Sequence, residues 1–455
     1  MFITSLTNKI KSINIPRSLH SLGTNLILLP LNILGSIIIA RSIGPGEKGN
    51  LDLIVATATL LVMVLSFSLQ AGATFIVARG GVNMRLLALK LLMFAVLQGL
   101  GASVLLAGLR ILGRSSLLIP DKIGNWVIAG VAVFVCCEML GNYLRAMLNG
   151  KQQIVKVNKA ELVGRFSQVV FLFMMAGALY ATGKRVFVAA LFGLSIGVTI
   201  LIDLLLIKSL YPYLRQSIGT SSVVPLITFA IPAYFANLTQ FLNYRLDVFI
   251  VGHFAGSASV GRYTLAVSLA QLLWLLSNAA ASVLLPKIAA DNSPENAQHT
   301  ARVTRLTLMA SLASGIALAV FANYALPLLY GEAFRPSVAA LLYLLPGVVV
   351  FSIANVLASY LAGIGKPQLN LLVSFSSLFF TVTLDLILIP KMDFLGAALT
   401  STVSYSWAAF LITWLFVRET KLPVRNLLLP TMDDVRLLGS IFEPFLRHVR
   451  PQQAG

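Results

Sequence analysis

Twelve apolar runs, each about as long as a membrane-spanning helix, follow one another along the chain with only short polar breaks between them. A helix needs about 20 mainly apolar residues to cross the hydrocarbon core of a bilayer. Only 11% of the residues are charged, whereas soluble domains carry about 25%. We therefore predict an all-α integral membrane protein with about 12 transmembrane helices and no room for a soluble catalytic domain. The runs lie at about 18–41, 51–76, 86–110, 124–148, 161–182, 186–208, 223–251, 263–286, 303–329, 337–362, 369–390 and 394–417.

These runs divide the chain into five parts. We expect a six-helix bundle at 18–210, a cytoplasmic linker at 211–222 and a second six-helix bundle at 223–417. An amphipathic segment at 1–17 precedes them, because its apolar residues recur at helical spacing beside lysines. A basic tail at 418–455 repeats this pattern and contains a second amphipathic helix, which we expect on the membrane surface.

Basic residues are unevenly shared between the two sides of the membrane. Lys and Arg number 22 in the segments on the side of the N-terminus and 10 on the opposite side. The positive-inside rule therefore places both termini of this multi-pass protein in the cytoplasm. The net charge of +18 reflects this distribution, so we expect no nucleic acid as a partner.

The two halves of the chain resemble each other when the sequence is shifted by 212 residues. Seven of the eighteen positions between 44 and 61 are then identical to their partners. The paired residues include Gly44 with Gly256, Gly49 with Gly261, Asn25 with Asn237 and Ser66 with Asn278. Further along, a shift of 215 pairs Gly150 with Gly365. We predict two repeat-related six-helix bundles that enter the membrane from the same side, an organisation typical of transporters.

Polar residues follow one face of several predicted spans. Such stripes would leave hydrogen-bonding groups unpaired if they faced lipid, so they face either another helix or a wet cavity. We favour a cavity between the bundles, because four repeat-related helices share the feature. Its expected lining consists of Asn25, Gln70, Asn237, Gln240, Asp247 and Asn278.

Charged residues at membrane depth are the other candidates for function. Arg245 and Asp247 lie about 200° apart on their helix and should not pair. Glu161 and Arg165 are spaced for an ion pair within one helix turn. The remaining buried acids are Glu138, Asp203 and Asp385. An intramembrane carboxylate such as Asp247, Glu138 or Asp385 is also a candidate for carrying a coupling proton or sodium ion.

Arginines at several membrane depths are candidate partners of an anionic group. Arg165 lies within the fifth predicted span, while Arg245 and Arg41 lie near the outer ends of the seventh and first. Together with Arg145 and Lys151 at the inner mouth, they form a ladder of positive charge. The competing interpretation is that Arg245 reaches the lipid headgroups and serves as an anchor.

Enzyme and cofactor motifs are weak in this sequence. Residues 44–49 match the dinucleotide pattern G-x-G-x-x-G but link two spans, so we interpret them as an outer turn. Residues 193–197 match G-x-S-x-G without a nearby base, and we expect their small residues at a helix contact. We predict no catalytic residues, no metal site and no cofactor.

Several stretches resemble bacterial oligosaccharide flippases, which belong to the multidrug, oligosaccharidyl-lipid and polysaccharide exporter superfamily. The resemblance extends over about 18–417 and rests on an ordered series of segments rather than on any one of them. The segments are 40–49, 244–252, 326–332, 345–348, 360–367 and 395–399.

This resemblance implies two bundles that form a V and alternate between inward and outward openings. It also implies that the protein flips a lipid-linked oligosaccharide, typically on undecaprenyl pyrophosphate, across the bacterial inner membrane. The product would serve O-antigen, capsule or exopolysaccharide synthesis. The implied partners are this substrate, membrane lipids and, in addition, a glycan polymerase or assembly proteins.

Other functions stay open at this point. A lipid II flippase or a multidrug or cation antiporter of the same superfamily is the main alternative, and a membrane glycan polymerase is a distant one. Residues 18–40 contain no Asp or Glu, although multidrug relatives often use a carboxylate there for cation coupling. The 38-residue tail has no room for the two extra helices that lipid II flippases usually carry. Both departures favour the O-antigen and exopolysaccharide branch.

Overall fold

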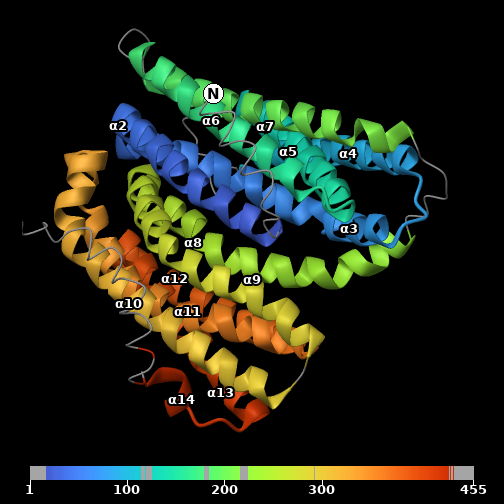
Figure 1. Ribbon diagram of the computed structural model, residues 1–455. Coiled ribbons are helices and arrows are strands. Elements are labelled where there is room, and N and C mark those ends of the chain that lie inside the picture. Colours follow the sequence, from blue (N-terminus) through green and yellow to red (C-terminus); the bar gives the residue numbers. More distant parts are fainter. Residues whose placement is uncertain are drawn as a thin grey trace, which may run out of the picture. The chain divides into compact units, whose positions relative to one another are not determined.

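The computed structural model describes residues 17–113, 118, 126–178, 184–215, 224–291, 293–429, 431 and 434. Helices form the long elements of this part of the chain (Figure 1). The predicted amphipathic segment at 1–17, except for Arg17, and the predicted tail helix after residue 434 lie outside the described residues. Part of the predicted linker at 211–222 also lies outside them.

The helices follow the apolar runs closely. Two of them, α2 and α8, each continue through a predicted span into the next, while α3 and α9 complete the second span of each pair. The elements are α2 (Arg17–Ser66), α3 (Leu69–Arg79), α4 (Met84–Ile111), α5 (Trp126–Gly150), α6 (Ile154–Ala178), α7 (Lys184–Arg215), α8 (Val224–Ala270), η2 (Gln271–Leu273), α9 (Trp274–Ala290), α10 (Pro294–Tyr330), η3 (Glu332–Phe334), α11 (Ser337–Gly363), α12 (Pro367–Met392), α13 (Phe394–Thr420) and α14 (Arg425–Leu428).

Length and hydropathy identify nine helical segments among the described residues that can cross a membrane. Two of the nine are merged pairs, Ile27–Ser66 with 40 residues and Tyr234–Ala290 with 57 residues. When each pair is counted as two spans, eleven of the twelve predicted spans are accounted for. The twelfth is α6, which carries Lys156, Lys159 and two further charged residues in its first half.

Single glycines interrupt the two merged helices at equivalent places. Gly44 has φ 73° and ψ 177° within α2, and Gly256 has φ 80° and ψ 174° within α8. This backbone region is open almost only to glycine. The 212-residue shift pairs these two glycines, so the structure supports the predicted repeat at this point.

The turns after α5 and α11 form a second equivalent pair, but in a different register from the one that we expected. Gln152 N donates to Asn149 O at 2.8 Å, and Gly365 N donates to Ala362 O at 3.0 Å. Both Gln152 (φ 57°) and Gly365 (φ 79°) have a left-handed backbone conformation. The backbone therefore pairs residue 152 with residue 365, a shift of 213 rather than the 215 that sequence identity suggested. Aligning the shared Gly-Lys dipeptides had displaced the predicted correspondence of the two turns by two residues.

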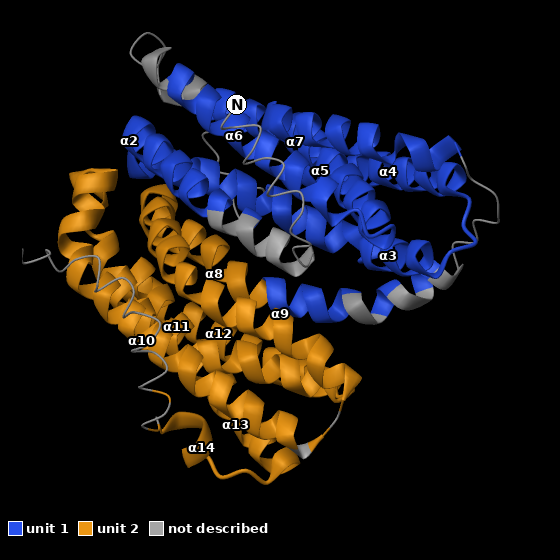
Figure 2. Cartoon of the chain, in the orientation of Figure 1, with its two compact units in different colours: residues 1–241 blue, residues 242–455 orange. Residues whose placement is uncertain are grey.

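Two compact units make up the chain, residues 1–241 and residues 242–455 (Figure 2). The division lies inside α8, so the first part of this helix packs with unit 1. There Tyr234 Oη donates to Val64 O at 3.0 Å, and a Cβ on Gly72 would lie 2.3 Å from Leu226 O. The boundary at 211–222 concerns the repeats and remains a prediction.

Each unit is built around one buried helix. In unit 1 this is α5, which packs against α2, α3, α4 and α7. In unit 2 it is α11, which packs against α9, α10 and α13. Small residues permit these close contacts: a Cβ on Gly99 would lie 2.9 Å from Cys136 Cβ, and one on Gly347 would lie 2.4 Å from Thr402 Cα.

The glycines of the G-x-S-x-G match have a different environment from the one that we predicted. A Cβ on Gly193 or Gly197 would meet nothing within 4 Å. These residues are therefore not at a close helix contact. Small residues permit such a contact only where a second helix lies over that face.

A short segment after α13 folds back onto α10 in unit 2. The buried carboxylate of Asp434 accepts hydrogen bonds from Arg305 Nε at 2.8 Å and from Thr431 Oγ1 at 2.7 Å. Arg305 also donates to the carbonyl oxygen of Asn426 in α14. Burial raises the pKa of Asp434, but the hydrogen bonds from Arg305 and Thr431 outweigh burial and hold this pKa at about 2.

Candidate functional site

A helix break in unit 1 gathers polar groups from three elements. Phe67 and Ser68 have φ of 45° and 48° and separate α2 from α3. A helix end leaves backbone carbonyls without their usual partners, and in a membrane these must be satisfied by protein. Gln98 of α4 fulfils this need, because its Nε2 donates to Leu65 O at 2.7 Å. Its Oε1 accepts from Tyr143 Oη at 2.9 Å.

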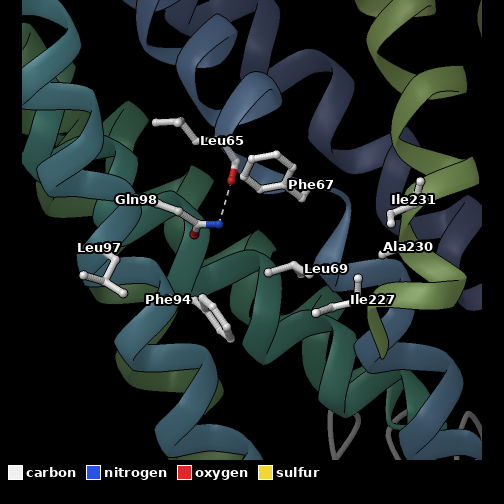
Figure 3. A pocket seen from close by; sticks show the side chains of 9 residues that line it. All are labelled: Leu65, Phe67, Leu69, Phe94, Leu97, Gln98, Ile227, Ala230 and Ile231. Atoms are coloured by element: carbon white, nitrogen blue, oxygen red, sulfur yellow. Dashed lines mark hydrogen bonds between the residues drawn. The ribbon is translucent and has the colours of Figure 1, made fainter. Parts of the chain in front are cut away.

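An apolar cavity of about 410 Å³ lies beside this break, entirely within unit 1. Figure 3 shows Gln98 turned toward the Leu65 carbonyl, with the side chains of α4 on one side of the cavity and those of α8 on another. The lining residues are Leu65, Phe67, Leu69, Phe94, Leu97, Gln98, Ile227, Ala230 and Ile231. Gln98 is the one polar side chain among them. This shape and chemistry suit a hydrocarbon chain.

Two of the predicted lining residues of unit 1 lie at the same break. Asn237 is exposed and its Nδ2 donates to Ser68 Oγ at 3.3 Å. Gln240 is also exposed, one helix turn further along α8. Gln70 is half-buried at the start of α3. The backbone of Asn25 lies in α2, but its side chain lies outside the described residues.

Unit 2 holds a different set, centred on Asp247. Its carboxylate is 3% exposed and accepts hydrogen bonds from Tyr263 Oη and, at 2.7 Å, from Val248 N. Tyr263 Oη lies 3.1 Å from Ser401 Oγ on α13. Asp385 of α12 is fully buried and acts electrostatically on Asp247, and within the described part of the chain neither of its oxygens has a hydrogen-bond partner. This interior combines two carboxylates with hydroxyl groups.

The other predicted residues of unit 2 remain on its surface. Arg245 is exposed while Asp247 is buried, so the two side chains lie on different faces of α8, as their spacing predicts. Asn278 is exposed on α9. Asp247 therefore differs from its predicted companions, because its carboxylate is turned into the interior of unit 2.

The predicted ion pair between Glu161 and Arg165 is wrong. Glu161 Oε1 accepts from Arg145 Nε at 2.8 Å, across the contact between α5 and α6. Arg165 Nη1 instead donates to Gln168 Oε1 at 2.9 Å, and its side chain is half-buried. Arg145 reaches Glu161 because the short turn after Gly150 holds the end of α5 against the start of α6. Arg145, a member of the predicted ladder, is thus engaged with carboxylates.

Arg41, the outermost member of that ladder, is exposed in α2, three residues before the Gly44 interruption. Arg165, Arg245 and Arg41 therefore remain accessible to different degrees, but the structure brings no two of them into a pair. Among the described residues, His, Cys, Asp and Glu form no group of three that can hold a metal ion.

Two functional groups escaped the sequence analysis. Tyr263 follows Asp247 by 16 residues and lies on the other side of the Gly256 turn, so no local spacing links them. Gln98 had a usable signal, since it is the one Gln, Asn, Asp or Glu in the 28 residues of α4. A lone amide in an apolar helix indicates a buried hydrogen-bond partner.

Comparison with known proteins identifies the family. A family model described as "Polysaccharide biosynthesis protein" matches residues 38–339. The capsular polysaccharide biosynthesis protein CapF of Staphylococcus aureus is 26% identical over 178 residues, which are 38% of this chain and 45% of the relative. The probable low-salt glycan biosynthesis flippase Agl15 of Haloferax volcanii is 24% identical over 165 residues, 35% of each chain. The matched segments thus span less than half of either relative.

Solved structures share the fold along most of the chain. The lipid II flippase MurJ, in an inward closed conformation, has a TM-score of 0.72 at 14% identity, covering 95% of this chain and 94% of its own. An inward-facing multidrug resistance MATE family transporter of the MOP superfamily has a TM-score of 0.67 at 14% identity, covering 86% and 94%. The all-α membrane transporter fold predicted from the sequence is therefore confirmed, while identities this low show the fold alone.

Proposed function

Because the chain belongs to the polysaccharide biosynthesis protein family, we propose that it is a flippase that moves a lipid-linked oligosaccharide across a membrane. The membrane is the bacterial inner membrane, both termini lie in the cytoplasm, and undecaprenyl pyrophosphate carries the glycan. The flipped glycan then enters O-antigen, capsule or exopolysaccharide synthesis, together with a polymerase or assembly proteins. The names of the relatives, a capsular polysaccharide protein and a glycan flippase, support this direction.

One observation carries the proposal: unit 1 places an exposed amide at the α2–α3 break, which an apolar cavity adjoins. Asn237 donates to Ser68 at this break, Gln240 follows one helix turn further along α8, and the cavity of about 410 Å³ offers apolar surface. A substrate that fits both is amphipathic, with a sugar headgroup and a hydrocarbon chain. A hydrophilic solute would gain nothing from the cavity, and a hydrocarbon without a headgroup would bring no polar group to the amides.

We assign the path of the headgroup to polar residues of both units. Asn25, Gln70, Asn237, Gln240 and Asn278 line it, and Arg165, Arg245 and Arg41 attract the pyrophosphate along it. Asp247 supports this path from the interior of unit 2, where Tyr263 holds its carboxylate. The protein itself makes and breaks no covalent bond in this scheme.

Reconstitution tests the proposal directly. The purified full chain is placed in liposomes with a fluorescent disaccharide linked to undecaprenyl pyrophosphate, and a membrane-impermeant quencher reports which leaflet holds the sugar. We expect flipping that requires the protein. Substituting Arg245 with Gln abolishes flipping and Arg245→Lys retains part of it, since a point charge still attracts phosphate without the planar fork of arginine. Leu372→Ala, at an exposed apolar position of α12, is the matched control.

Three outcomes would contradict the proposal. Sugar movement that is equal in protein-free liposomes removes the flippase activity. Movement of a cationic dye without the lipid-linked sugar makes the chain an antiporter. Lengthening of the glycan makes it a polymerase. Full flipping by the Gln variants of both Arg245 and Arg165 removes the arginines from the path and leaves the amides as its supported part.

A further inference from the structure

Three carboxylates share one guanidinium group inside unit 1. Arg145 of α5 lies 2.8 Å from Glu161 of α6 and 3.6 Å from Glu138 of its own helix. Asp203 of α7 faces the same group, because Arg145, Glu138 and Glu161 are the charges that act on it. Glu161 lies seven residues into α6, which places the cluster roughly 10 Å along the helix from the α5–α6 turn.

Asp203 is the member without a partner. Its side chain is 4% exposed, and its Oδ1 is buried without a hydrogen-bond partner in the part of the chain that the structure describes. The missing side chain of Gly141 allows this approach. A Cβ there would lie 2.6 Å from Asp203 Oδ1 and 3.0 Å from Arg145 Nη1, so both atoms point toward the same small space.

The charges of this cluster do not balance. Glu138 and Glu161 lie within ion-pair distance of Arg145, so this one cation already faces two carboxylates. An ionised Asp203 would add a third negative charge in a buried position, where the loss of hydration opposes ionisation. A buried acid in this situation takes up a proton instead.

We propose that Glu138, Arg145, Glu161 and Asp203 form a proton-binding site, with the exchangeable proton on the carboxylate of Asp203. A metal ion fits less well, since the guanidinium group of Arg145 occupies the centre of the carboxylates and repels a second cation. A proton avoids this repulsion because it converts Asp203 to a neutral acid. Asp203 then gains an O–H donor. A neighbouring carboxylate oxygen can accept this hydrogen bond, and the space beside Gly141 leaves room for it.

The surrounding helices do not supply another cation to Asp203. On α6, Arg165 donates to Gln168, and Lys156 lies 5.5 Å from the Tyr213 ring centre. On α5, the neutral thiols of Cys136 and Cys137 are its other titratable neighbours. Among residues whose side chains the structure describes, the remaining charged residues of the helices packed on α7 are not among the charges that act on Asp203 and lie elsewhere on those helices: Lys159 on α6, Arg85, Lys90 and Arg110 on α4, and Arg41, Glu47, Lys48 and Asp52 on α2, with Lys208 and Arg215 on α7 itself.

This site gives the transporter a means of coupling to a proton gradient, an extension that rests on the proposed function. Release of the proton creates an unbalanced negative charge in unit 1, and its uptake removes that charge. A conformational change that alters the access of Asp203 to water would therefore bind or release one proton.

Infrared spectroscopy of the purified full chain tests the site without any transport. The carbonyl stretch of a protonated carboxyl group shifts in deuterium oxide and disappears on ionisation. We expect wild-type protein to show such a band at neutral pH, to lose it at high pH, and to lose the Asp203 component in Asp203→Asn. Asp385→Asn is the matched control, because Asp385 is a buried acid of unit 2 and its removal leaves the Asp203 component in place.

A second variant guards against misfolding. Gly141→Ala inserts a methyl group between Asp203 and Arg145, and we expect it to move the pH at which this component titrates while Asp203 itself is retained. A spectrum unchanged by Asp203→Asn overturns the proposal, as does a component that responds to sodium chloride and not to pH. In liposomes, Asp203→Asn should lose the response of flipping to a pH gradient.

The two proposals fail separately. A titrating Asp203 component without any flipping leaves the proton site standing and removes the flippase function. Flipping without such a component removes the proton site and leaves the function.

Discussion

The glycine that interrupts α2 in unit 1 has a counterpart in unit 2, where Gly256 interrupts α8 with almost the same backbone angles. The turns after α5 and α11 also agree, down to the hydrogen bonds that Gln152 and Gly365 donate. These shared turns fix which residues of the two units correspond. They show that duplication has preserved the positions where helices reverse or bend.

The interiors of the two units differ at those corresponding positions. With the shift of 213 residues fixed by the turn, Glu138 corresponds to Phe351 and Arg145 to Ala358. With the shift of 212 fixed by the glycines, Asp247 corresponds to Gly35 and Tyr263 to Leu51. Unit 1 therefore has an ion-pair cluster where unit 2 is apolar, and unit 2 has an acid and a phenol where unit 1 is apolar. The two units share the positions of their turns, but they differ in their buried polar and charged groups.

Helix breaks differ as well. Unit 1 breaks at Phe67 and Ser68, with left-handed backbone and a hydrogen bond from Gln98 to the freed carbonyl of Leu65. Unit 2 passes from α8 to α9 through the 3₁₀ turn at 271–273, where residues keep right-handed angles. The break in unit 1 has the apolar cavity beside it.

Removal of Arg145 should give the largest loss of stability, and this loss should arise within unit 1. Arg145→Ala leaves Glu138 and Glu161 partly buried without their cation, which should destabilise the protein by roughly 3 kcal/mol, the lower end for buried pairs. Thermal unfolding of the purified protein measures this. Arg335→Ala in unit 2 is the control, because its pair with Glu332 has a similar distance of 2.7 Å but is exposed, and no change is expected.

Equal melting temperatures for Arg145→Ala and the wild type would show that unit 1 does not depend on its ion pairs. The contrast between the two interiors would then be one of composition only.

Substitution of the paired glycines tests the part that the units share. Gly44→Ala and Gly256→Ala should each cost about 1–3 kcal/mol, since only the backbone conformation is strained and nothing lies within 4 Å of either new Cβ. Gly46→Ala is the control, because it has equal space without a positive φ. Denaturation of the three variants in the same detergent measures the costs. A large loss in one variant and none in its counterpart would break the equivalence of the two turns.

The sequence predicted the helices and the repeat well because both depend on patterns that a membrane imposes. Apolar length gives the spans, and a glycine with a required positive φ persists in both halves. The sequence did not predict that α2 and α8 each change direction without a loop, because a single residue in an unusual conformation is enough to turn a helix. The register at Gly150 was misjudged, since the turn requires a left-handed residue and Gln152 meets that need without being glycine.

Partners within the interior could not be predicted in the same way. Local spacing predicted a pair between Glu161 and Arg165, but Arg145 approaches from another helix and donates a hydrogen bond to Glu161. Asp247 followed a polar stripe on a helical projection, yet its carboxylate turns to Tyr263, which lies beyond the Gly256 turn. Such contacts depend on how helices pack, and periodicity along one helix carries no information about its neighbour.

The smallest expected effect concerns the segment that unit 2 holds against α10. Asp434 has a pKa of about 2 in the folded protein, below its ordinary value of 3.8. A carboxyl group whose pKa is lowered on folding stabilises the fold above its ordinary pKa, and this contribution disappears as the pH falls through the folded value. The attachment of residues 421–434 should therefore be complete at neutral pH and weaken progressively from about pH 4 to about pH 2.

Hydrogen exchange of this segment, compared between variants at the same pH, measures the attachment. Asp434→Asn should weaken it by roughly 1 kcal/mol at pH 7, the net contribution of a typical hydrogen bond, and should approach the wild type near pH 2. Arg305→Gln should behave similarly, because its guanidinium group is largely buried and donates to both Asp434 and Asn426. Arg302→Gln should have a smaller effect, since Arg302 is half exposed and lies 3.5 Å from the carboxylate. An Asp434→Asn variant that already matches the wild type at pH 7 would assign the attachment to apolar packing of α14, and the charged anchor would no longer distinguish unit 2 from unit 1.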